Sequence, residues 1–352
     1  MSVIIVVYNA RPFLCRLFRA LTRQTYPNYE LIVFDNASTD GSADLVSADT
    51  PHIRLIRSPT NLGYAAGNNV AVAHSRGEYV AILNPDTEPE PGWLAALVGT
   101  LDADSTIGLA TSQIVLDTDH GTINTCGNDV HVAGFATCRG LGAPVGDYAE
   151  GADVAAISGA AFIIRREMWE QLGGFDERFF TYVEDTDLSW RAWLLGARCR
   201  YVPGSVVAHR YTLTLGPEKT YYLERNRLLM LLKCYEMRTL LLLAPALVLA
   251  ECSAWVYALL RGPAHLRAKV GAAWWIITHR ADILHWRRQV QASRVMGDRV
   301  LLSHATSRLP ITLVRPSRFM RFVAGCATIP FAFFRHTALG VERLLCSKRA
   351  ES

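Results

Sequence analysis

Apolar runs and helical apolar periodicity alternate along the first hundred residues of the chain. Short apolar runs are typical of buried strands, whereas apolar residues that recur every three or four positions indicate amphipathic helices. The predicted strands are 3–7, 31–34, 53–56 and 79–83, and the predicted helices are 13–21, 43–48, 65–75 and 91–101. This alternation predicts a parallel sheet with helices on both of its faces.

The pattern is less regular in the middle of the chain. Residues 117–153 are rich in Gly, Asp and Thr, have no clear period, and are interpreted as loops and short strands. Regular elements return after them, with predicted strands at 157–164 and 198–202 and predicted helices at 166–172, 186–195 and 218–236.

The last part of the chain has a different character. Residues 239–260 are nearly all apolar, and their length is close to the roughly 20 residues that cross a bilayer core. Arginines alternate with Trp and Ile in residues 261–299, a pattern typical of helices on anionic lipid, and residues 322–341 form a second apolar stretch. We expect membrane association. The alternative is a helical subdomain that packs on the front of the chain, or an oligomer contact.

Composition and charge sharpen this division. The chain has 352 residues, of which 50% are hydrophobic and 19% are charged, which excludes intrinsic disorder. Residues 1–235 carry a net charge of −7 and residues 236–352 carry +11, so the two parts are expected to meet different surroundings. The four Lys lie outside any P-loop sequence and the eight Cys form no C-x-x-C pair, which argues against P-loop, zinc-ribbon and thioredoxin-like chemistry.

Polar residues follow the predicted strands of the first hundred residues. Tyr8 and Asn9 follow the first strand, and Asp35 ends the second. Asp86 and Glu88 follow the fourth strand and are hard oxygen ligands suited to Mg²⁺ or Mn²⁺. Ligands of open α/β sheets bind beyond the carboxyl ends of strands, so these residues are candidates for a ligand site. Each string taken alone is better explained as a solvated turn.

A second acidic cluster consists of Glu184, Asp185 and Asp187. Three carboxylates within four residues repel one another unless a helix N-terminus or a cation offsets them. Arg191 lies one turn after Asp187 and can pair with it. Asp187 therefore has two interpretations, a structural helix start and a functional carboxylate, and both remain open.

The ordered set of strings resembles family 2 glycosyltransferases of the GT-A fold, over roughly residues 1–235. The matching strings are VVYNA, DNASTDGS, NLGYAAGNN, LNPDTEP and SGAAFIIRREMWEQLGGFDERFFTYVEDTDLSWRAWLLG. Within the family, the long string and the absence of a Q-x-x-R-W sequence resemble the rhamnosyltransferase-like branch. The resemblance implies an α/β, Rossmann-like and mostly parallel sheet, here with a C-terminal helical segment that associates with membranes. It implies a catalytic domain at 1–215 and a helical region at 216–352.

The resemblance also implies roles for residues at the nucleotide and metal sites. By analogy, the nucleotide base and ribose are contacted by Tyr8, Asn9 and Asp35, and the nucleotide-sugar cleft is bordered by Gly63 and Asn68. Asp86 is expected to bind the Mg²⁺ or Mn²⁺ cofactor. Asn84 stands where a stricter motif has its first Asp, which leaves the number of protein ligands open.

The family places its general base at Asp185, with Glu184 orienting the acceptor or sharing the proton. That base takes the proton from the acceptor hydroxyl in one displacement, which inverts the anomeric centre. His209 is expected to reach the metal or the diphosphate, although a lone His is often structural. Weaker candidates for contact with donor or acceptor are Gly159, Asp187 and Arg210.

The resulting hypothesis is an inverting, metal-dependent glycosyltransferase that acts on a lipid-linked or polysaccharide precursor. L-rhamnose from dTDP-rhamnose is the favoured donor, and the cytoplasmic side of the cell membrane is the expected location, with peripheral or monotopic attachment. Oligomerisation is left open, and no nucleic-acid partner is expected. The alternatives are a non-catalytic nucleotide- or saccharide-binding membrane scaffold of the same fold, and a nucleotidyltransferase. The second would need a basic, glycine-rich N-terminal loop, which residues 1–15 lack.

Overall fold

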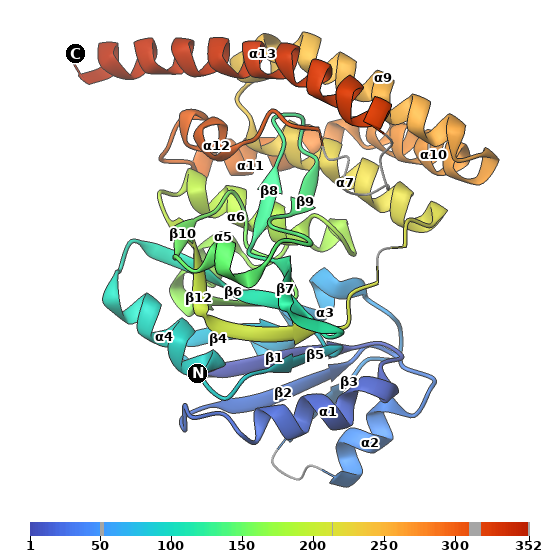
Figure 1. Ribbon diagram of the computed structural model, residues 1–352, viewed down its shortest axis with the longest axis vertical. Coiled ribbons are helices and arrows are strands. Elements are labelled where there is room, and N and C mark those ends of the chain that lie inside the picture. Colours follow the sequence, from blue (N-terminus) through green and yellow to red (C-terminus); the bar gives the residue numbers. More distant parts are fainter. Residues whose placement is uncertain (50–52, 213, 310–317, 351–352) are drawn as a thin grey trace. The chain divides into compact units, whose positions relative to one another are not determined.

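The computed structural model describes residues 1–49, 53–212, 214–309 and 318–350 (Figure 1). It divides into two compact units. The first unit comprises residues 1–128, 138–192 and 197–212, and the second comprises residues 129–137, 193–196 and 213–352. Within the second apolar stretch of the sequence, the side chains of residues 322–327 lie outside the described part.

A ten-stranded sheet forms the centre of the first unit, in the order β10-β12-β6-β11-β4-β1-β2-β3, with β5 paired to β12 and β7 paired to β6. Its strands are β1 (Ser2–Val7), β2 (Glu30–Asp35), β3 (Ile53–Arg57), β4 (Tyr79–Leu83), β5 (Thr87–Pro89), β6 (Ile107–Leu116), β7 (Asp119–Thr125), β10 (Ala152–Asp153), β11 (Ala161–Arg165) and β12 (Arg198–His209). A separate two-stranded ribbon joins β8 (Asn128–Val130) and β9 (Ala136–Cys138).

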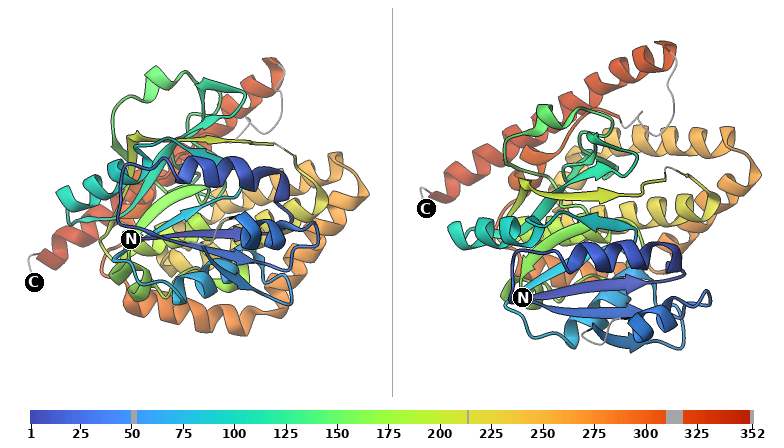
Figure 2. Two further views of the ribbon diagram at one scale, coloured as in Figure 1. Left: turned by 90° about the horizontal axis from the view of Figure 1, so that it is seen from below. Right: turned by 60° about the horizontal axis from the view of Figure 1, so that its bottom comes forward.

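Strands β1 to β4 run parallel, as the alternating pattern predicts, and Figure 2 shows β1 and β2 pointing the same way. The rest of the sheet is mixed, because β11 lies antiparallel between β4 and β6. Strand β6 was not predicted from the sequence. Its centre carries Thr111, Ser112 and Gln113, which are polar and buried. Their side chains form hydrogen bonds with residues distant in the sequence, and no local pattern reveals such partners.

Helices cover both faces of the sheet. They are α1 (Arg11–Leu21), α2 (Ser42–Asp49), α3 (Gly63–Ala73), α4 (Trp93–Ala103), α5 (Arg166–Leu172) and α6 (Glu184–Leu194), with short 3-10 turns at Val145–Tyr148 and Glu177–Phe179. Alternate residues of β1 share one core with α1 and α4. On the other face α3 approaches closely, because a Cβ at Gly67 would lie 3.0 Å from Val6. The carboxyl ends of β1, β2 and β4 are thereby left at one edge.

The second unit is helical. It contains α7 (Pro217–Cys234), α8 (Met237–Leu242), α9 (Ala244–Leu260), α10 (Pro263–Thr278), α11 (Arg280–Ser293), α12 (Arg299–His304) and α13 (Arg318–Ala350) (Figure 1). The apolar stretch 239–260 is not one helix but falls on α8 and α9, which meet at Leu243. Among the residues that the structure describes, no helix is both long enough and apolar enough to cross a membrane.

Two arginines of α7 are buried, since Arg225 is 6% exposed and Arg227 is 2% exposed. Arg227 forms ion pairs with Glu224 at 2.8 Å and with Glu251 of α9. Contacts within α7 and with α9 therefore compensate the buried charge of Arg227.

Candidate active site

The ends of β1 and β2 lie side by side, since Val7 is in register with Asp35. Tyr8 is 51% exposed beyond β1, whereas Asp35 is 4% exposed and accepts a hydrogen bond from the Ser38 backbone. Asn9 has a left-handed φ of 52°, and its Oδ1 accepts from the Thr39 backbone at 2.8 Å. The structure thus brings the three predicted nucleotide-binding residues to one edge, where Asn9 also holds the loop after β2.

Asn36 joins this edge to the start of α3 and was not singled out in the sequence analysis. Its Nδ2 donates to the Gly63 carbonyl at 3.0 Å, and its Oδ1 accepts from the Leu62 backbone at 2.8 Å. Gly63 has φ +82°, and a Cβ there would lie 2.4 Å from the Phe180 ring, so only glycine fits. Asn68 is fully buried one turn further on, and its Oδ1 has no hydrogen-bond partner.

Asp185 lies at the start of α6, and donors surround its carboxylate. Oδ2 accepts from the Gly159 backbone at 2.8 Å and from Asn128 Nδ2 at 3.1 Å. Oδ1 accepts from the backbone and hydroxyl of Thr186, at 2.6 and 3.1 Å. Burial raises the pKa of Asp185, and these hydrogen bonds lower it in part. A carboxylate that is desolvated yet held in one orientation is suited to act as a general base.

Glu184 differs from Asp185 because few hydrogen bonds compensate for the burial of its carboxyl group. It is 6% exposed, and its Oε2 has no hydrogen-bond partner. Burial raises the pKa of Glu184 well above its usual range, and the nearby Asp185 and Asp187 raise it further. Two adjacent carboxyl groups in unequal environments favour one neutral acid beside one carboxylate.

Tyr64 is a site residue that the sequence analysis missed. Its hydroxyl donates to the Gly159 carbonyl at 2.6 Å, and the same glycine's N–H reaches Asp185. Burial raises the pKa of Tyr64 well above its usual range, with further contributions from Glu184 and Asp185. The available signal was its place in the NLGYAAGNN string, four residues before Asn68. Gly159 therefore connects the string on α3 to the acidic cluster on α6.

The loop before the acidic cluster has a strained backbone. Phe180, Tyr182 and Val183 all have left-handed φ angles, of 62°, 67° and 71°. Such conformations cost about 1–3 kcal/mol each in non-glycine residues and cluster at functional sites. The Phe180 carbonyl accepts from the Ala65 backbone at 3.1 Å, so contact with α3 stabilises this loop. This loop leads directly into Glu184 and Asp185 at the start of α6.

Asp86 and His209 form the candidate metal site. The pairing of β5 with β12 places His209 opposite Thr87, so that His209 Nε2 lies 3.4 Å from Asp86 Oδ1. Nδ1 of His209 lies 2.8 Å from Asn124 Oδ1, and this contact orients the ring so that Nε2 faces Asp86. A carboxylate oxygen beside a free imidazole nitrogen fits a divalent cation such as Mn²⁺.

The protein offers this cation few ligands. No group of three or more His, Cys, Asp or Glu that could hold a metal occurs within the described ranges. Glu88, suggested from the sequence as a second oxygen ligand, instead pairs with Arg16 at 2.5 Å. Asn84 Oδ1 is buried without a hydrogen-bond partner, two residues before Asp86. The residues present fit a cation that takes its remaining ligands from a diphosphate and water.

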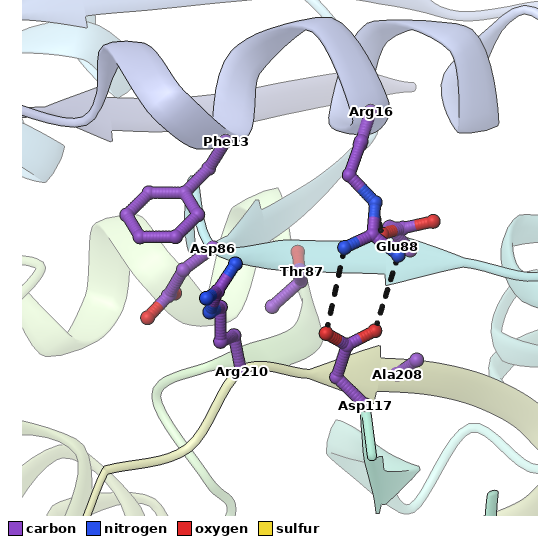
Figure 3. A pocket seen from close by; sticks show the side chains of 8 residues that line it. All are labelled: Phe13, Arg16, Asp86, Thr87, Glu88, Asp117, Ala208 and Arg210. Atoms are coloured by element: carbon purple, nitrogen blue, oxygen red, sulfur yellow. Dashed lines mark hydrogen bonds and ion pairs between the residues drawn. The ribbon is translucent and has the colours of Figure 1, made fainter.

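A small pocket lies beside this site, and Figure 3 shows its side chains. Arg16 lies between Glu88 and Asp117, with Arg16 Nη2 at 3.3 Å from Asp117 Oδ1. Arg210 extends beside Asp86 and over the Phe13 ring, 5.7 Å from its centroid. Arg210 thus places positive charge next to the candidate metal site, as a diphosphate contact requires.

Asp187 has a different environment from the other two acids. It is fully buried and accepts a hydrogen bond from Arg191 Nε at 2.8 Å. Arg191 also donates to the carbonyls of Leu172 and Gly174, at 2.7 and 3.0 Å. This arrangement favours the structural interpretation of Asp187, which fastens α6 to the end of α5.

Comparison with solved structures places this architecture in the GT-A class of glycosyltransferases. TarS of S. aureus, residues 1–349 in complex with UDP-GlcNAc, has a TM-score of 0.55 and 17% identity, over 97% of this chain and 91% of that chain. GalNAc-T7 with UDP, GalNAc and Mn²⁺ has a TM-score of 0.54 and 18% identity, over 67% of this chain and 48% of that chain. At these identities the likeness shows the fold alone.

The family follows from the sequence comparisons. The model of Glycosyl transferase family 2 matches residues 2–173. A curated relative, N-acetylglucosaminyl-diphospho-decaprenol L-rhamnosyltransferase of Mycobacterium tuberculosis, is 28% identical over 247 residues, which are 63% of this chain and 80% of the relative. Residues 2–173 therefore match a family 2 glycosyl transferase domain, and the chain is a glycosyltransferase. The resemblance stated from the five sequence strings is confirmed.

Proposed function

We propose that this glycosyltransferase inverts the anomeric centre as it moves a sugar from a nucleotide donor to a hydroxyl of a lipid-linked or polysaccharide precursor. The observation that carries the proposal is Asp185, a desolvated carboxylate oriented by Gly159, Asn128 and Thr186. The name of the Mycobacterium tuberculosis relative supports L-rhamnose as the transferred sugar and a polyprenyl-diphosphate saccharide as acceptor, and we propose dTDP-rhamnose as the donor.

The reaction proceeds in one displacement. The acceptor hydroxyl oxygen forms a bond to the anomeric carbon while the bond from that carbon to the diphosphate breaks, and the nucleoside diphosphate leaves with the electron pair. Asp185 takes the hydroxyl proton. The Thr186 hydroxyl can rotate away from Oδ1, which frees a lone pair there for the acceptor. Glu184 in its neutral form adds no second negative charge beside the base.

We propose that Asp86 and His209 hold Mg²⁺ or Mn²⁺, supported by GalNAc-T7, whose structure contains Mn²⁺ with UDP. A bound cation supplies Lewis-acid stabilisation to the leaving diphosphate. Asn124 orients His209, so Asn124→Ala is expected to weaken Mn²⁺ binding in the presence of UDP about 10- to 100-fold. Manganese paramagnetic resonance measures this without turnover. Unchanged Mn²⁺ affinity in Asn124→Ala would contradict the His209 assignment.

The location proposed is the cytoplasmic side of a membrane, because the donor is water-soluble and the acceptor is anchored in lipid. The basic second part of the chain supports this attachment. The catalytic domain is proposed to end near residue 215, and the helical region from residue 216 onward to provide attachment. The oligomeric state, which the sequence leaves open, is to be measured by analytical ultracentrifugation.

The decisive experiment measures release of dTDP or UDP with Mn²⁺ and a lipid-linked acceptor. Asp185→Asn is expected to reduce turnover at least a thousandfold, while donor-dependent thermal stabilisation is retained, because the amide keeps the shape but not the basicity. Full turnover of Asp185→Asn would exclude this residue as the base.

Asn84 supports one competing function, a non-catalytic binding scaffold, since an amide there replaces an acidic ligand. Metal-dependent binding of nucleoside diphosphate, without turnover on any acceptor tested, would favour the scaffold.

A further inference from the structure

Helix α9 has the reverse of the polarity expected for a surface helix. Its buried residues are alanines spaced by four, namely Ala246, Ala250, Ala254 and Ala258. Its exposed residues are large and apolar, with Val248 61%, Val256 55%, Leu259 64% and Leu260 80% exposed. A surface helix normally buries its large apolar residues and exposes polar ones. The outward face of α9 is therefore suited to an apolar environment.

The single charged residue of α9 does not interrupt this face. Glu251 points into the unit, where it pairs with Arg227 and lies 2.8 Å from Lys269 Nζ. Lys269 is 1% exposed and also pairs with Glu224. Glu251, which made residues 239–260 a doubtful transmembrane span, is thus an ion-pair residue with a 30% exposed side chain, and the exposed Val and Leu residues of α9 carry no charge among them.

Basic and aromatic residues accompany the apolar face. Helix α10 packs against α9 and runs beside it (Figure 1). It exposes Val270, Trp274 and Ile277 on one stripe, with Arg267 on the preceding turn. Arg261, also exposed, lies between the two helices. Tryptophan and arginine beside an apolar surface are the composition of interfacial helices.

The length of α9 determines how it can meet a bilayer. It has 17 residues, which extend about 26 Å at 1.5 Å per residue, shorter than a hydrocarbon core of about 30 Å. An orientation parallel to the membrane surface needs no such length. It also keeps the buried side of α9, with Glu251, against α7 and α10.

We propose that the outward face of α9 inserts into the interface of an anionic bilayer, with Arg261 and Arg267 at the lipid headgroups. This deepens the proposed function by naming the surface that holds the enzyme at its acceptor. Charge decides between lipid and a second copy of the chain as the occupant. Two copies would bring two segments of +11 together, whereas anionic lipid attracts each basic residue.

Sedimentation of the full chain with vesicles tests the proposal, using phosphatidylcholine alone or with phosphatidylglycerol. Val256→Gln combined with Leu260→Gln removes apolar surface without changing the charge, and is expected to weaken binding to the anionic vesicles at least tenfold. Val295→Gln with Met296→Gln is the matched control, because both residues are exposed in the same unit but lie outside α9. Binding of the wild-type chain is expected to fall as salt rises.

A labelling experiment keeps the test independent of stability changes. Cys252 is exposed on α9 and Cys15 is exposed on α1, so each can carry an environment-sensitive fluorophore. Single-label variants are made by replacing the other of the two with Ser, in a background with Cys326→Ser and Cys346→Ser. A blue shift on anionic vesicles is expected for the probe at Cys252 and not for the probe at Cys15.

The outcomes separate lipid, self-association and catalysis. Wild-type vesicle binding by the Val256→Gln, Leu260→Gln variant, or equal blue shifts at both probes, would overturn the proposal. The proposal would also be overturned if the wild-type chain formed a dimer, the variant were monomeric, and both bound vesicles equally well. In that case a second copy of the chain, and not lipid, covers α9. Vesicle binding needs neither donor nor acceptor, so an inactive chain that still binds would contradict the proposed function and leave this inference intact.

Discussion

The backbone N–H of Gly159 donates to Asp185 Oδ2 at 2.8 Å, and a Cβ at position 159 would lie 3.3 Å from that oxygen. The φ of Gly159 is outside the left-handed region, so alanine fits its backbone. The glycine is thus required by the close approach of the carboxylate and not by the turn. Sequence analysis had assigned it to the donor sugar, and that contact stays a prediction.

Gly159→Ala is expected to lower kcat about tenfold and to leave donor binding unchanged. The added methyl group displaces the carboxylate by a few tenths of an ångström, which misaligns the proton acceptor. Steady-state kinetics and donor-dependent thermal shifts separate the two effects. Gly146→Ala is the control, because nothing lies within 4 Å of a Cβ there. Equal kcat values in the two variants would show that the contact does not position the base.

Tyr64→Phe is expected to move the acid limb of the pH–rate profile to higher pH. Loss of the hydroxyl removes the donor that holds the Gly159 carbonyl, so the backbone that carries the N–H bond to Asp185 is positioned less firmly, and weakening of that bond raises the pKa of the carboxyl further. A buried carbonyl left without a partner also costs about 1–3 kcal/mol of stability. A purely structural role would lower the unfolding free energy and leave the pH profile in place.

Asp187→Asn is expected to lower the free energy of unfolding by about 3 kcal/mol, since it leaves the buried Arg191 guanidinium without its carboxylate. Urea denaturation measures this. Asp185→Asn is expected to lose much less stability and far more activity. A stable Asp187→Asn variant with impaired kcat/KM would instead assign Asp187 to donor or acceptor contact.

Glu184→Gln is expected to become more stable relative to wild type as pH rises. The folded-state pKa of Glu184 is raised by burial, so the folded chain retains its proton above about pH 4.5, where the unfolded chain loses it. The contribution of Glu184 to the stability of the wild-type chain is full below that pH and is lost as pH rises through the folded-state pKa of Glu184. Denaturation at pH 5 and pH 8 measures the difference. The exposed Glu167→Gln control should show no such trend.

The strands and helices of the alternating half of the first unit were predicted from the sequence because each has its own apolar pattern within a few consecutive residues. The apolar run of β1 and the helical spacing of α1 each carry their own signal, and the structure confirms all eight elements from residue 3 to residue 101 within a few residues. The mixed half was harder to predict. β6 buries Thr111, Ser112 and Gln113, whose polar groups are satisfied only by distant partners such as the carbonyl of Ala161.

Sequence alone determined the family, through five short strings in a fixed order, and it determined which residues stand at strand ends. Tertiary structure decided which of those residues meet. The Asp86–His209 pair depends on strand pairing across more than a hundred residues, and the Tyr64–Gly159–Asp185 connection joins two of the strings. The tertiary structure also decided that Glu251 pairs with the buried Arg227 and Lys269, which leaves α9 with an uncharged outer face. Such contacts form between residues far apart in the chain, and periodicity within one segment carries no information about them.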